Sequence, residues 1–210
     1  MPNILIFCAH SDDEAIGMSG TIAKYVEQKK KVIKVVLSHG EMSHPHFQEK
    51  HVKKARKKET KKASEMIGIK ETMYLGLKDA SLKREINKPK VERQIKGIIK
   101  RFNPEKIYCT SAKDPHPDHR AVNKIVLQIV DTFRKKYPVY GYEVWNIQDE
   151  THPRVYVDIS GYMDQKLEYI KMFKSQWVFM FSLYLPALFR AKKFGAKNHC
   201  KYAERFYKLR

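Results

Sequence analysis

The chain has 210 residues, enough for one domain with a sizeable core, and 42% of them are hydrophobic. Its longest apolar stretch, residues 177–189, is too short to cross a bilayer and contains Pro186, which excludes a transmembrane helix there. Cys8, Cys109 and Cys200 form an odd set without paired spacing. We expect reduced thiols in a cytoplasmic protein, and no signal peptide, because the first strand begins near the start of the chain.

Lys and Arg outnumber Asp and Glu by 42 to 23, which gives a formal net charge of +19. Nucleic-acid binding, an anionic substrate and a lysine-rich surface of the hyperthermophile kind each explain such an excess. No zinc-finger spacing, RNP motif or GxxG loop accompanies the charge, and many lysines fall on predicted solvent faces. A charged surface is therefore the preferred interpretation, and nucleic acid is not the expected partner.

Strand and helix patterns alternate along the chain. Strands are expected at residues 3–8, 32–38, 72–75, 105–109, 139–145 and 154–158. Helical periodicity covers residues 15–29, 51–67, 88–101, 118–136 and 162–176. This order predicts an α/β fold, a Rossmann-like three-layer sandwich with a mainly parallel central sheet, in a single domain over residues 1–210. The tail from residue 177 onward has only a weak periodic signal.

The first candidate site follows the first expected strand. Residues 4–8 form a continuous apolar run, typical of a strand covered on both faces, and residues 9–14 (AHSDDE) come next. Ligand crevices of parallel sheets open at the carboxyl ends of the strands. His10, Asp12 and Asp13 at that edge indicate a divalent-metal site, because imidazole and carboxylate are good zinc ligands.

A second cluster, residues 114–120 (DPHPDHR), follows the expected strand 105–109 and opens the next helix. His116 and His119 are three residues apart and share one side of a helix that begins here, and Pro117 suits its first turn. Either cluster alone has an ordinary explanation as a turn or a helix cap. Two histidine–carboxylate clusters on one rim, each after a strand, favour a shared metal site.

These motifs resemble those of the LmbE-like (PIG-L) family of zinc-dependent N-acetyl-sugar deacetylases. The family's first motif reads AHPDDE where this chain has AHSDDE, and its second reads HPDH, as at residues 116–119. Residues 17–20 (GMSG), 39–41 (HGE) and 202–206 (YAERF) also look like family segments, so the similarity spans the chain. The resemblance implies metal-dependent removal of an acetyl group from an N-acetylated amino sugar of the N-acetylglucosamine type.

By this resemblance His10, Asp13 and His119 would bind one zinc ion per chain, although the same ligands suit iron(II) and cobalt. Three protein ligands leave an open position for water, whose pKa the metal would lower. The chain departs from the family pattern at Ser11, which replaces a proline, and at Ser19, which replaces a glycine. Neither change removes a ligand, but Ser11 could loosen the turn that aims His10 and Asp13.

The resemblance also implies roles for residues around the metal. Asp12 would act as the general base, protonated His116 would stabilise the oxyanion, and Asp118 would orient His116. Arg56 would hold substrate hydroxyls, because the family has an Arg-x-x-Glu pattern at the matching place. Glu41, in the segment similar to the family's Gly-Glu loop, is a further candidate for contact with substrate.

The basic segment 50–62 gives a separate indication about Arg56. The apolar stripe of a helix here contains Val52, Ala55, Ala63, Met66 and Ile67. Arg56 and Glu59 fall inside that stripe, where an unpaired charge is costly. Either the two residues form a structural ion pair, or Glu59 steers Arg56 toward the crevice.

Other functions stay open at this point. The same chemistry fits a non-sugar or lipid-linked amide, and a basic nucleic-acid-binding protein is supported by charge alone. Tail aromatics beside Arg190 fit a peripheral membrane surface, and they also fit core packing or the subunit interface of a homo-oligomer. These aromatics are Phe173, Trp177, Phe179, Phe181, Tyr184 and Phe189. Further candidates for contact with substrate or a second metal are His39, His44, His46 and His51.

Overall fold

The computed structural model describes residues 2–43, 48–145 and 151–210, apart from the side chains of residues 177–181. Its strands are β1 Asn3–Cys8, β2 Lys31–Ser38, β3 Glu71–Leu77, β4 Lys106–Thr110, β5 Val139–Tyr142, β6 Arg154–Asp158 and β7 Ala203–Lys208. Its α-helices are α1 Asp13–Glu27, α2 Glu49–Ile67, α3 Leu82–Glu85, α4 Pro89–Phe102, α5 Pro117–Asp131, α6 Met163–Lys171 and α7 Trp177–Lys197. Short 3₁₀ turns are η1 Glu41–Ser43, η2 Ser160–Tyr162 and η3 Lys174–Gln176.

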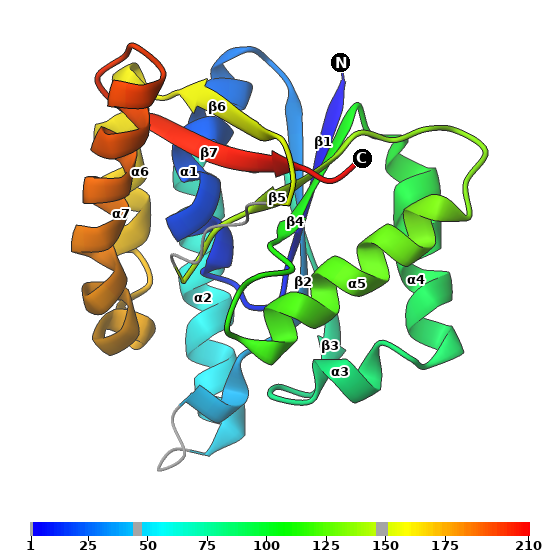
Figure 1. Cartoon of the computed structure of the whole chain (residues 1–210). Coiled ribbons are helices and arrows are strands. Elements are labelled where there is room, and N and C mark those ends of the chain that lie inside the picture. The colour runs from blue at the N-terminus through cyan, green and yellow to red at the C-terminus, as the bar shows by residue number, and fades with distance from the viewer. Residues whose placement is uncertain (1, 44–47, 146–150) are drawn as a thin grey trace.

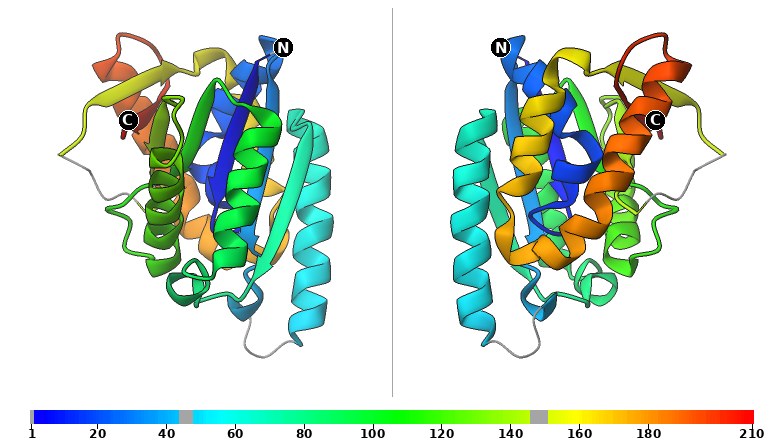
Figure 2. Two further views of the ribbon diagram at one scale, coloured as in Figure 1. Left: turned by 90° about the vertical axis from the view of Figure 1, so that its right-hand side faces the viewer. Right: turned by 90° about the vertical axis from the view of Figure 1, so that its left-hand side faces the viewer.

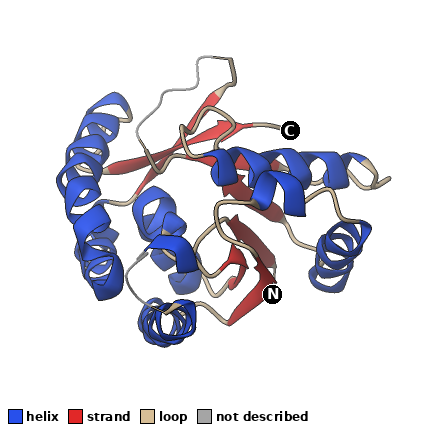
Figure 3. Ribbon diagram, turned by 90° about the horizontal axis from the view of Figure 1, so that it is seen from below, coloured by secondary structure: helices blue, strands red, loops and turns tan. Residues whose placement is uncertain are grey.

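The described strands form one sheet in the order β3-β2-β1-β4-β5-β7-β6. β1 to β5 run parallel to one another, and β7 pairs antiparallel with both β5 and β6. Helices cover both faces, with α1, α2, α6 and α7 on one and α3, α4 and α5 on the other (Figure 1, Figure 3). The two side views in Figure 2 face these helical layers in turn. The predicted three-layer α/β fold with a mainly parallel sheet is confirmed.

The core explains the unbroken apolar run of β1. Ile4 and Ile6 point into the core under α1 and α6, whereas Leu5 and Phe7 point into the core under α4 and α5. Successive strand residues point to opposite faces, so a strand covered on both sides is apolar at every position. β1 is therefore a fully buried strand whose last residue opens onto the carboxyl edge of the sheet.

The sequence gives only a weak periodic signal from residue 177 onward, but in the structure this tail is regular. Residues 177–197 form α7 and residues 203–208 form β7. The apolar pattern of β7 is interrupted by Glu204 and Arg205, which are buried because Lys166 and Glu143 pair with them. Within α7 lies Pro186, a residue that normally interrupts helices. Elsewhere the expected elements are present, although α5 ends before residue 136 and residues 162–176 divide into α6 and η3.

The tail aromatics divide between core and surface. Phe173 is buried and Tyr184 packs against the same core, whereas Leu185 and Phe189 on α7 are 60% and 69% exposed. No described helix combines the length and apolar character that a bilayer crossing requires. Three of the tail aromatics have side chains outside the described part of the structure, namely Trp177, Phe179 and Phe181.

The close approach of α1 to β5 gives a first prediction. A Cβ at Gly17 would lie 2.8 Å from the Glu143 carbonyl oxygen, so we expect Gly17→Ala to lower the free energy of unfolding by about 1–3 kcal/mol. At Gly97 in α4 a Cβ meets nothing within 4 Å, and alanine there should stabilise the helix by about 1 kcal/mol. Denaturant unfolding of both variants checks this, and equal stability of the two would contradict the packing.

Candidate metal centre

The candidate site lies at the carboxyl ends of β1 and β4, which are neighbours in the sheet. The strand order reverses at this point, with β2 and β3 on one side and β5, β7 and β6 on the other. Such a switch point leaves a crevice between two loops, where α/β proteins bind ligands. The loops here are residues 9–12 after β1 and residues 111–116 after β4.

Three of the expected ligands meet in this crevice. His10 follows β1, Asp13 begins α1 and His119 lies in the first turn of α5. Each offers one ligand atom, and these atoms lie within 4.8 Å of one another. Asp13 Oδ1 is 3.1 Å from His119 Nε2 and 3.7 Å from His10 Nδ1, and the centroids of the two imidazole rings are 5.6 Å apart. Two histidines and one carboxylate are a donor set that suits Zn²⁺.

Each imidazole has a buried carboxylate beside the ring nitrogen that faces away from Asp13. His119 Nδ1 lies 2.9 Å from Asp114 Oδ1, and His10 Nε2 lies 3.0 Å from Asp79 Oδ1. Metal-binding histidines commonly place their second ring nitrogen on a carboxylate, which fixes the ring and makes the first nitrogen a better ligand. The nitrogens that face Asp13 are thereby left for a cation, so these residues fit a bound metal.

Burial and charge act in opposite directions on this cluster. Burial lowers the pKa of both imidazoles, but the carboxylates outweigh it, raising the pKa of His119 to about 9 and that of His10 well above its ordinary value. Burial raises the pKa of the Asp13 carboxyl, but His119 and His10 outweigh this and hold it well below its usual range. The crevice therefore stabilises positive charge, as a cation site requires.

Asp79 and Asp118 flank the other side of His10. Asp118 Oδ1 accepts a hydrogen bond from the Leu82 N–H at 3.1 Å, and its Oδ2 lies 3.7 Å from His10 Nε2. Asp79 Oδ2 accepts a hydrogen bond from the Met42 N–H at 2.9 Å. With His10 the two carboxylates form a second group of possible ligand atoms, but we interpret them as support for the His10 ring. Asp79 is not among the site residues expected from the sequence, although its place just after β3 puts it on the same rim.

His116 caps the start of α5 with its ring. The Asp118 N–H donates a hydrogen bond to His116 Nδ1 at 3.2 Å, so the proton of the neutral ring sits on Nε2. Burial, together with His119 and His10, lowers the pKa of His116. The expectation was a protonated ring oriented by the Asp118 side chain. In the structure the backbone N–H of Asp118 orients the ring, and the Asp118 carboxylate faces Leu82 and His10 instead.

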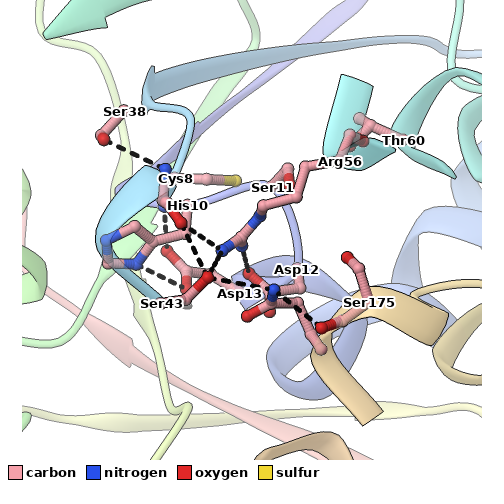
Figure 4. A network of polar contacts seen from close by, with 12 residues as sticks. Cys8, His10, Ser11, Asp12, Asp13, Ser38, Ser43, Arg56, Thr60 and Ser175 are labelled. Carbon is pink, nitrogen blue, oxygen red and sulfur yellow. Dashed lines mark hydrogen bonds and ion pairs between the residues drawn. The ribbon is translucent and has the colours of Figure 1, made fainter. Parts of the chain in front are cut away.

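Arg56 reaches from α2 to Asp12 (Figure 4). Its Nη2 donates to Asp12 Oδ1 at 2.9 Å, and its Nη1 donates to the Gly40 carbonyl at 3.0 Å and to Ser43 Oγ at 3.3 Å. Only 4% of the residue is exposed. Gly40 has a φ of +69°, and a Cβ there would collide with the guanidinium, so both the turn and the close approach require glycine.

Glu59 contacts η3 rather than Arg56. Its carboxylate accepts hydrogen bonds from the Ser175 N–H at 2.9 Å and from Ser175 Oγ at 2.6 Å. The next residue, Gln176, donates from Nε2 to Ser43 Oγ at 3.3 Å. Of the two alternatives for this pair, the structural ion pair is therefore wrong: Arg56 reaches the crevice, and Glu59 instead ties α2 to the segment that carries Gln176.

The buried side of α2 is also rotated from the expected apolar stripe, because Ala55 is exposed and Met66 is 40% exposed. Thr60 is buried at low cost, since its hydroxyl donates to the Arg56 carbonyl at 2.7 Å within the helix. Hydropathy alone does not register such internally satisfied side chains. The buried residues of α2 are Val52, Arg56, Thr60, Ala63, Ser64 and Ile67.

Glu41 is buried beneath the loop that follows β2. Its carboxylate accepts hydrogen bonds from Ser38 Oγ and from the Asp79 N–H, each at 3.4 Å, and Lys53 Nζ lies 3.4 Å away. The described residues that line the cavity do not include Glu41. The structure thus places this predicted substrate contact behind the cavity wall, where it holds Asp79.

A cavity of about 270 Å³ opens over the ligand group. Its polar lining comprises His10, Asp12, Asp13, Ser43, Arg56, Asp79, His116, His119 and Gln176. The rest of its lining comes from Ile16, Gly40, Met42, Ala80, Val144, Trp145 and Leu183. Of the loop histidines, His39 packs against Tyr74 with ring centroids 4.9 Å apart, and His51 is exposed. His44 and His46 lie outside the described residues.

The family model named PIG-L, described as GlcNAc-PI de-N-acetylase, matches residues 5–130, more than half of the chain, including both metal-site segments. The chain belongs to the PIG-L family. One curated relative is a probable N-acetyl-alpha-D-glucosaminyl L-malate deacetylase 2 of Bacillus anthracis, 27% identical over 185 residues that cover 83% of this chain and 81% of that protein. Another is the diacetylchitobiose deacetylase of Thermococcus kodakarensis, 29% identical over 191 residues, with 83% and 70% covered.

Solved structures show the same fold as this PIG-L chain. A conserved protein of Thermus thermophilus superposes with a TM-score of 0.85 at 21% identity, covering 100% of this chain and 96% of the other. The N,N'-diacetylchitobiose deacetylase of Pyrococcus horikoshii gives 0.84 at 22% identity, covering 99% and 83%. The 4-carboxy-2-hydroxymuconate hydratase GalB of Pseudomonas putida gives 0.82 at 22% identity, covering 100% and 97%. Because a hydratase shares the fold, the activity must be argued from the site.

The carboxylates behind the histidines give a second prediction. Asp79→Asn and Asp114→Asn should each weaken metal binding by about 10- to 100-fold, because the rings lose the negative charges that orient them and make them better ligands. Competition with a coloured chelator measures the dissociation constant. Asp131→Asn is the control, since Asp131 is an exposed residue that pairs with Arg210. Unchanged metal affinity in both site variants would contradict the assigned support.

Proposed function

We propose that the protein is a zinc-dependent N-deacetylase that hydrolyses the acetamido group of an N-acetylglucosamine-type sugar to acetate and the free amino sugar. The observation that carries the proposal is the buried group of His10, Asp13 and His119 in a cavity that Asp12 also lines. The curated relatives named for deacetylation of N-acetylglucosaminyl malate and of diacetylchitobiose support this class of reaction.

His10, Asp13 and His119 would hold one zinc ion per chain. When bound, zinc would polarise the acetyl carbonyl and lower the pKa of a water molecule on its open position. Asp79 and Asp114 would keep the two imidazoles aimed at the metal from behind.

Asp12 would take the proton of the attacking water. Arg56 Nη2 donates a hydrogen bond to Asp12 Oδ1 at 2.9 Å. We therefore assign the proton from the water to the other carboxylate oxygen of Asp12, Oδ2. Asp12 occupies the N-cap position of α1, directly before the ligand Asp13, without a side-chain capping hydrogen bond. Adjacent side chains point in different directions, so one turn presents both the base and a ligand. Protonated Asp12 would then deliver the proton to the departing amine.

His116 would stabilise the oxyanion through its Nε2–H, because Nδ1 already accepts the Asp118 N–H. The centroid of its ring lies 5.0 Å from that of His10 and 4.7 Å from that of His119, which places it beside the metal group. A positioned donor of this kind typically contributes about 10²–10³ in kcat. Asp118 would act through its backbone on His116 and through its carboxylate on His10.

The cavity limits how much of the substrate is enclosed. Its volume of about 270 Å³ is below the usual range of about 300–1,000 Å³ for small-molecule sites, which suits one sugar ring with its acetamido group. Arg56 lines the cavity and would reach a substrate hydroxyl while it holds Asp12, and Glu41 would shape the same wall from behind. The apolar wall around Trp145 suits the acetyl methyl group and the C–H face of the ring.

An amidase for a non-sugar or lipid-linked amide is the second candidate. The mycothiol S-conjugate amidase of Streptomyces coelicolor is 27% identical over 192 residues, which cover 76% of this chain and 65% of that protein. The same residues would carry that hydrolysis.

Contact with a membrane surface or with a second copy of the chain would use the exposed Leu185 and Phe189 of α7. The buried free thiols of Cys8 and Cys109 fit a cytoplasmic location.

Removing the base gives a third prediction. Asp12→Ala should keep stoichiometric zinc but lose about 10²–10⁴ in kcat, because general base catalysis is lost while the ligands remain. His119→Ala, which removes a ligand, should lose the metal itself. Metal analysis combined with acetate release from a panel of N-acetylated sugars measures both effects. Wild-type turnover by Asp12→Ala would refute the base assignment, and a zinc-loaded wild type that releases no acetate from any sugar would favour the amidase.

Arg56 gives a fourth prediction. Arg56→Gln should lower kcat/KM by about 10²-fold, chiefly through kcat, because a misplaced Asp12 slows the chemical step. Lys58→Gln, an exposed position on the same helix, should leave both constants unchanged. Steady-state kinetics on the best sugar substrate separates the two constants. A rise in KM with kcat intact would mean that Arg56 serves substrate binding alone.

A further inference from the structure

Lys34 is a charged residue in the middle of an apolar strand. Its relative exposure is 0%, and its neighbours in β2, Ile33 and Val35, are core residues. Removing an ammonium group from water is costly unless good partners replace the water. The Nζ of Lys34 donates a hydrogen bond to the Ser11 carbonyl at 2.6 Å and pairs with Glu14 Oε1.

Glu14 anchors this ammonium from the first turn of α1. It is also fully buried, and it accepts a hydrogen bond from Tyr169 Oη at 2.6 Å and one from Cys8 Sγ at 3.3 Å. The ring centroid of Phe173 lies 5.6 Å from Lys34 Nζ. β1, β2, α1 and the α6 side of the core therefore meet at one buried charge pair beneath the metal-site turn.

The contact to Ser11 falls at a sensitive place in that turn. The Ser11 carbonyl belongs to the peptide that leads into Asp12, and the turn carries His10 on one side and Asp13 on the other. Within the same turn, the His10 N–H donates a hydrogen bond to Asp13 Oδ2 at 3.0 Å. The Ser11 hydroxyl is buried and has no hydrogen-bond partner among the described residues, so the Ser11 side chain does not restrain the turn.

We propose that Lys34 is a positioning residue for the metal-site turn: by holding the Ser11 carbonyl it fixes the peptide that aims Asp12 and Asp13. A proline at position 11 would restrain this turn through its own ring. With serine in that place, the restraint comes from outside, through a hydrogen bond from β2. The inference rests on the proposed function only in taking this turn as the source of a metal ligand and the base.

The test compares two buried lysine–glutamate pairs. Lys34→Met/Glu14→Gln removes both charges of the first pair, which leaves no unpaired buried charge. The matched control is Lys166→Met/Glu204→Gln, because Lys166 is equally buried and bonds Glu204 at 2.6 Å and the Ile16 carbonyl at 2.7 Å, beyond the turn. Circular dichroism and thermal melting establish folding, chelator competition gives the Zn²⁺ dissociation constant, and the visible absorption of the Co²⁺-loaded protein reports ligand geometry.

We expect the Lys34 variant to fold, to bind Zn²⁺ about 10-fold or more weakly, and to show an altered Co²⁺ spectrum, in the range known for lost supporting contacts. The control should match wild type in both readouts. A folded Lys34 variant with wild-type affinity and spectrum would overturn the proposal, as would an equal loss in the control. If this double variant does not fold, Lys34→Leu/Glu14→Gln, which also leaves no unpaired buried charge, is measured by the same criteria.

The metal readouts also separate this inference from the proposed deacetylase activity. They are independent of which amide the enzyme hydrolyses. A wild type that binds Zn²⁺ but releases no acetate would refute the deacetylase, while a weakened Lys34 variant would still support the positioning role. Active wild type with an unaffected Lys34 variant would support the deacetylase and refute the positioning role.

Discussion

The parallel pairing of β1 with β4 is the constraint on which the site depends. Ile4, Leu5 and Ile6 lie in register with residues 106–108, so the two strands end at the same edge of the sheet. The loops that follow start side by side, although they are distant in sequence. His10 reaches the crevice from one loop, and His119 turns back toward it from the first turn of α5. Helix α1 supplies Asp13 between them, and the three groups meet around one point.

A buried ion pair fixes the first turn of α1, and with it the ligand Asp13. Lys34 and Glu14 secure its first turn to β2, and farther along the helix Glu204 of β7 accepts hydrogen bonds from the N–H groups of Gly20 and Thr21 at 3.0 and 2.7 Å. Buried pairs add little net stability, because desolvation offsets their attraction. Their effect here is one of position: Lys34 and Glu14 hold the turn that carries the ligand, whereas Lys166 and Glu204 hold α1 beyond that turn.

Local sequence patterns predict most of the fold and the residues that bear the chemistry. The unbroken apolar run of β1 and the two histidine motifs are visible in the sequence, because strand burial and metal ligation each demand particular residue types. What the sequence does not reveal is the partner of each polar group across the sheet. Asp79 behind His10, Ser175 against Glu59 and the charged residues of β7 become intelligible only when distant strands are placed side by side.

The central claim is that two distant segments hold one cation through His10, Asp13 and His119. The most direct test is a crystal structure of the zinc-loaded protein with anomalous data at the zinc absorption edge. We predict one strong peak per chain, with both imidazoles at zinc–nitrogen distances of about 2.0–2.1 Å and the Asp13 carboxylate in contact. A peak held by Asp79 and Asp118 instead, or none in the crevice, would contradict the account.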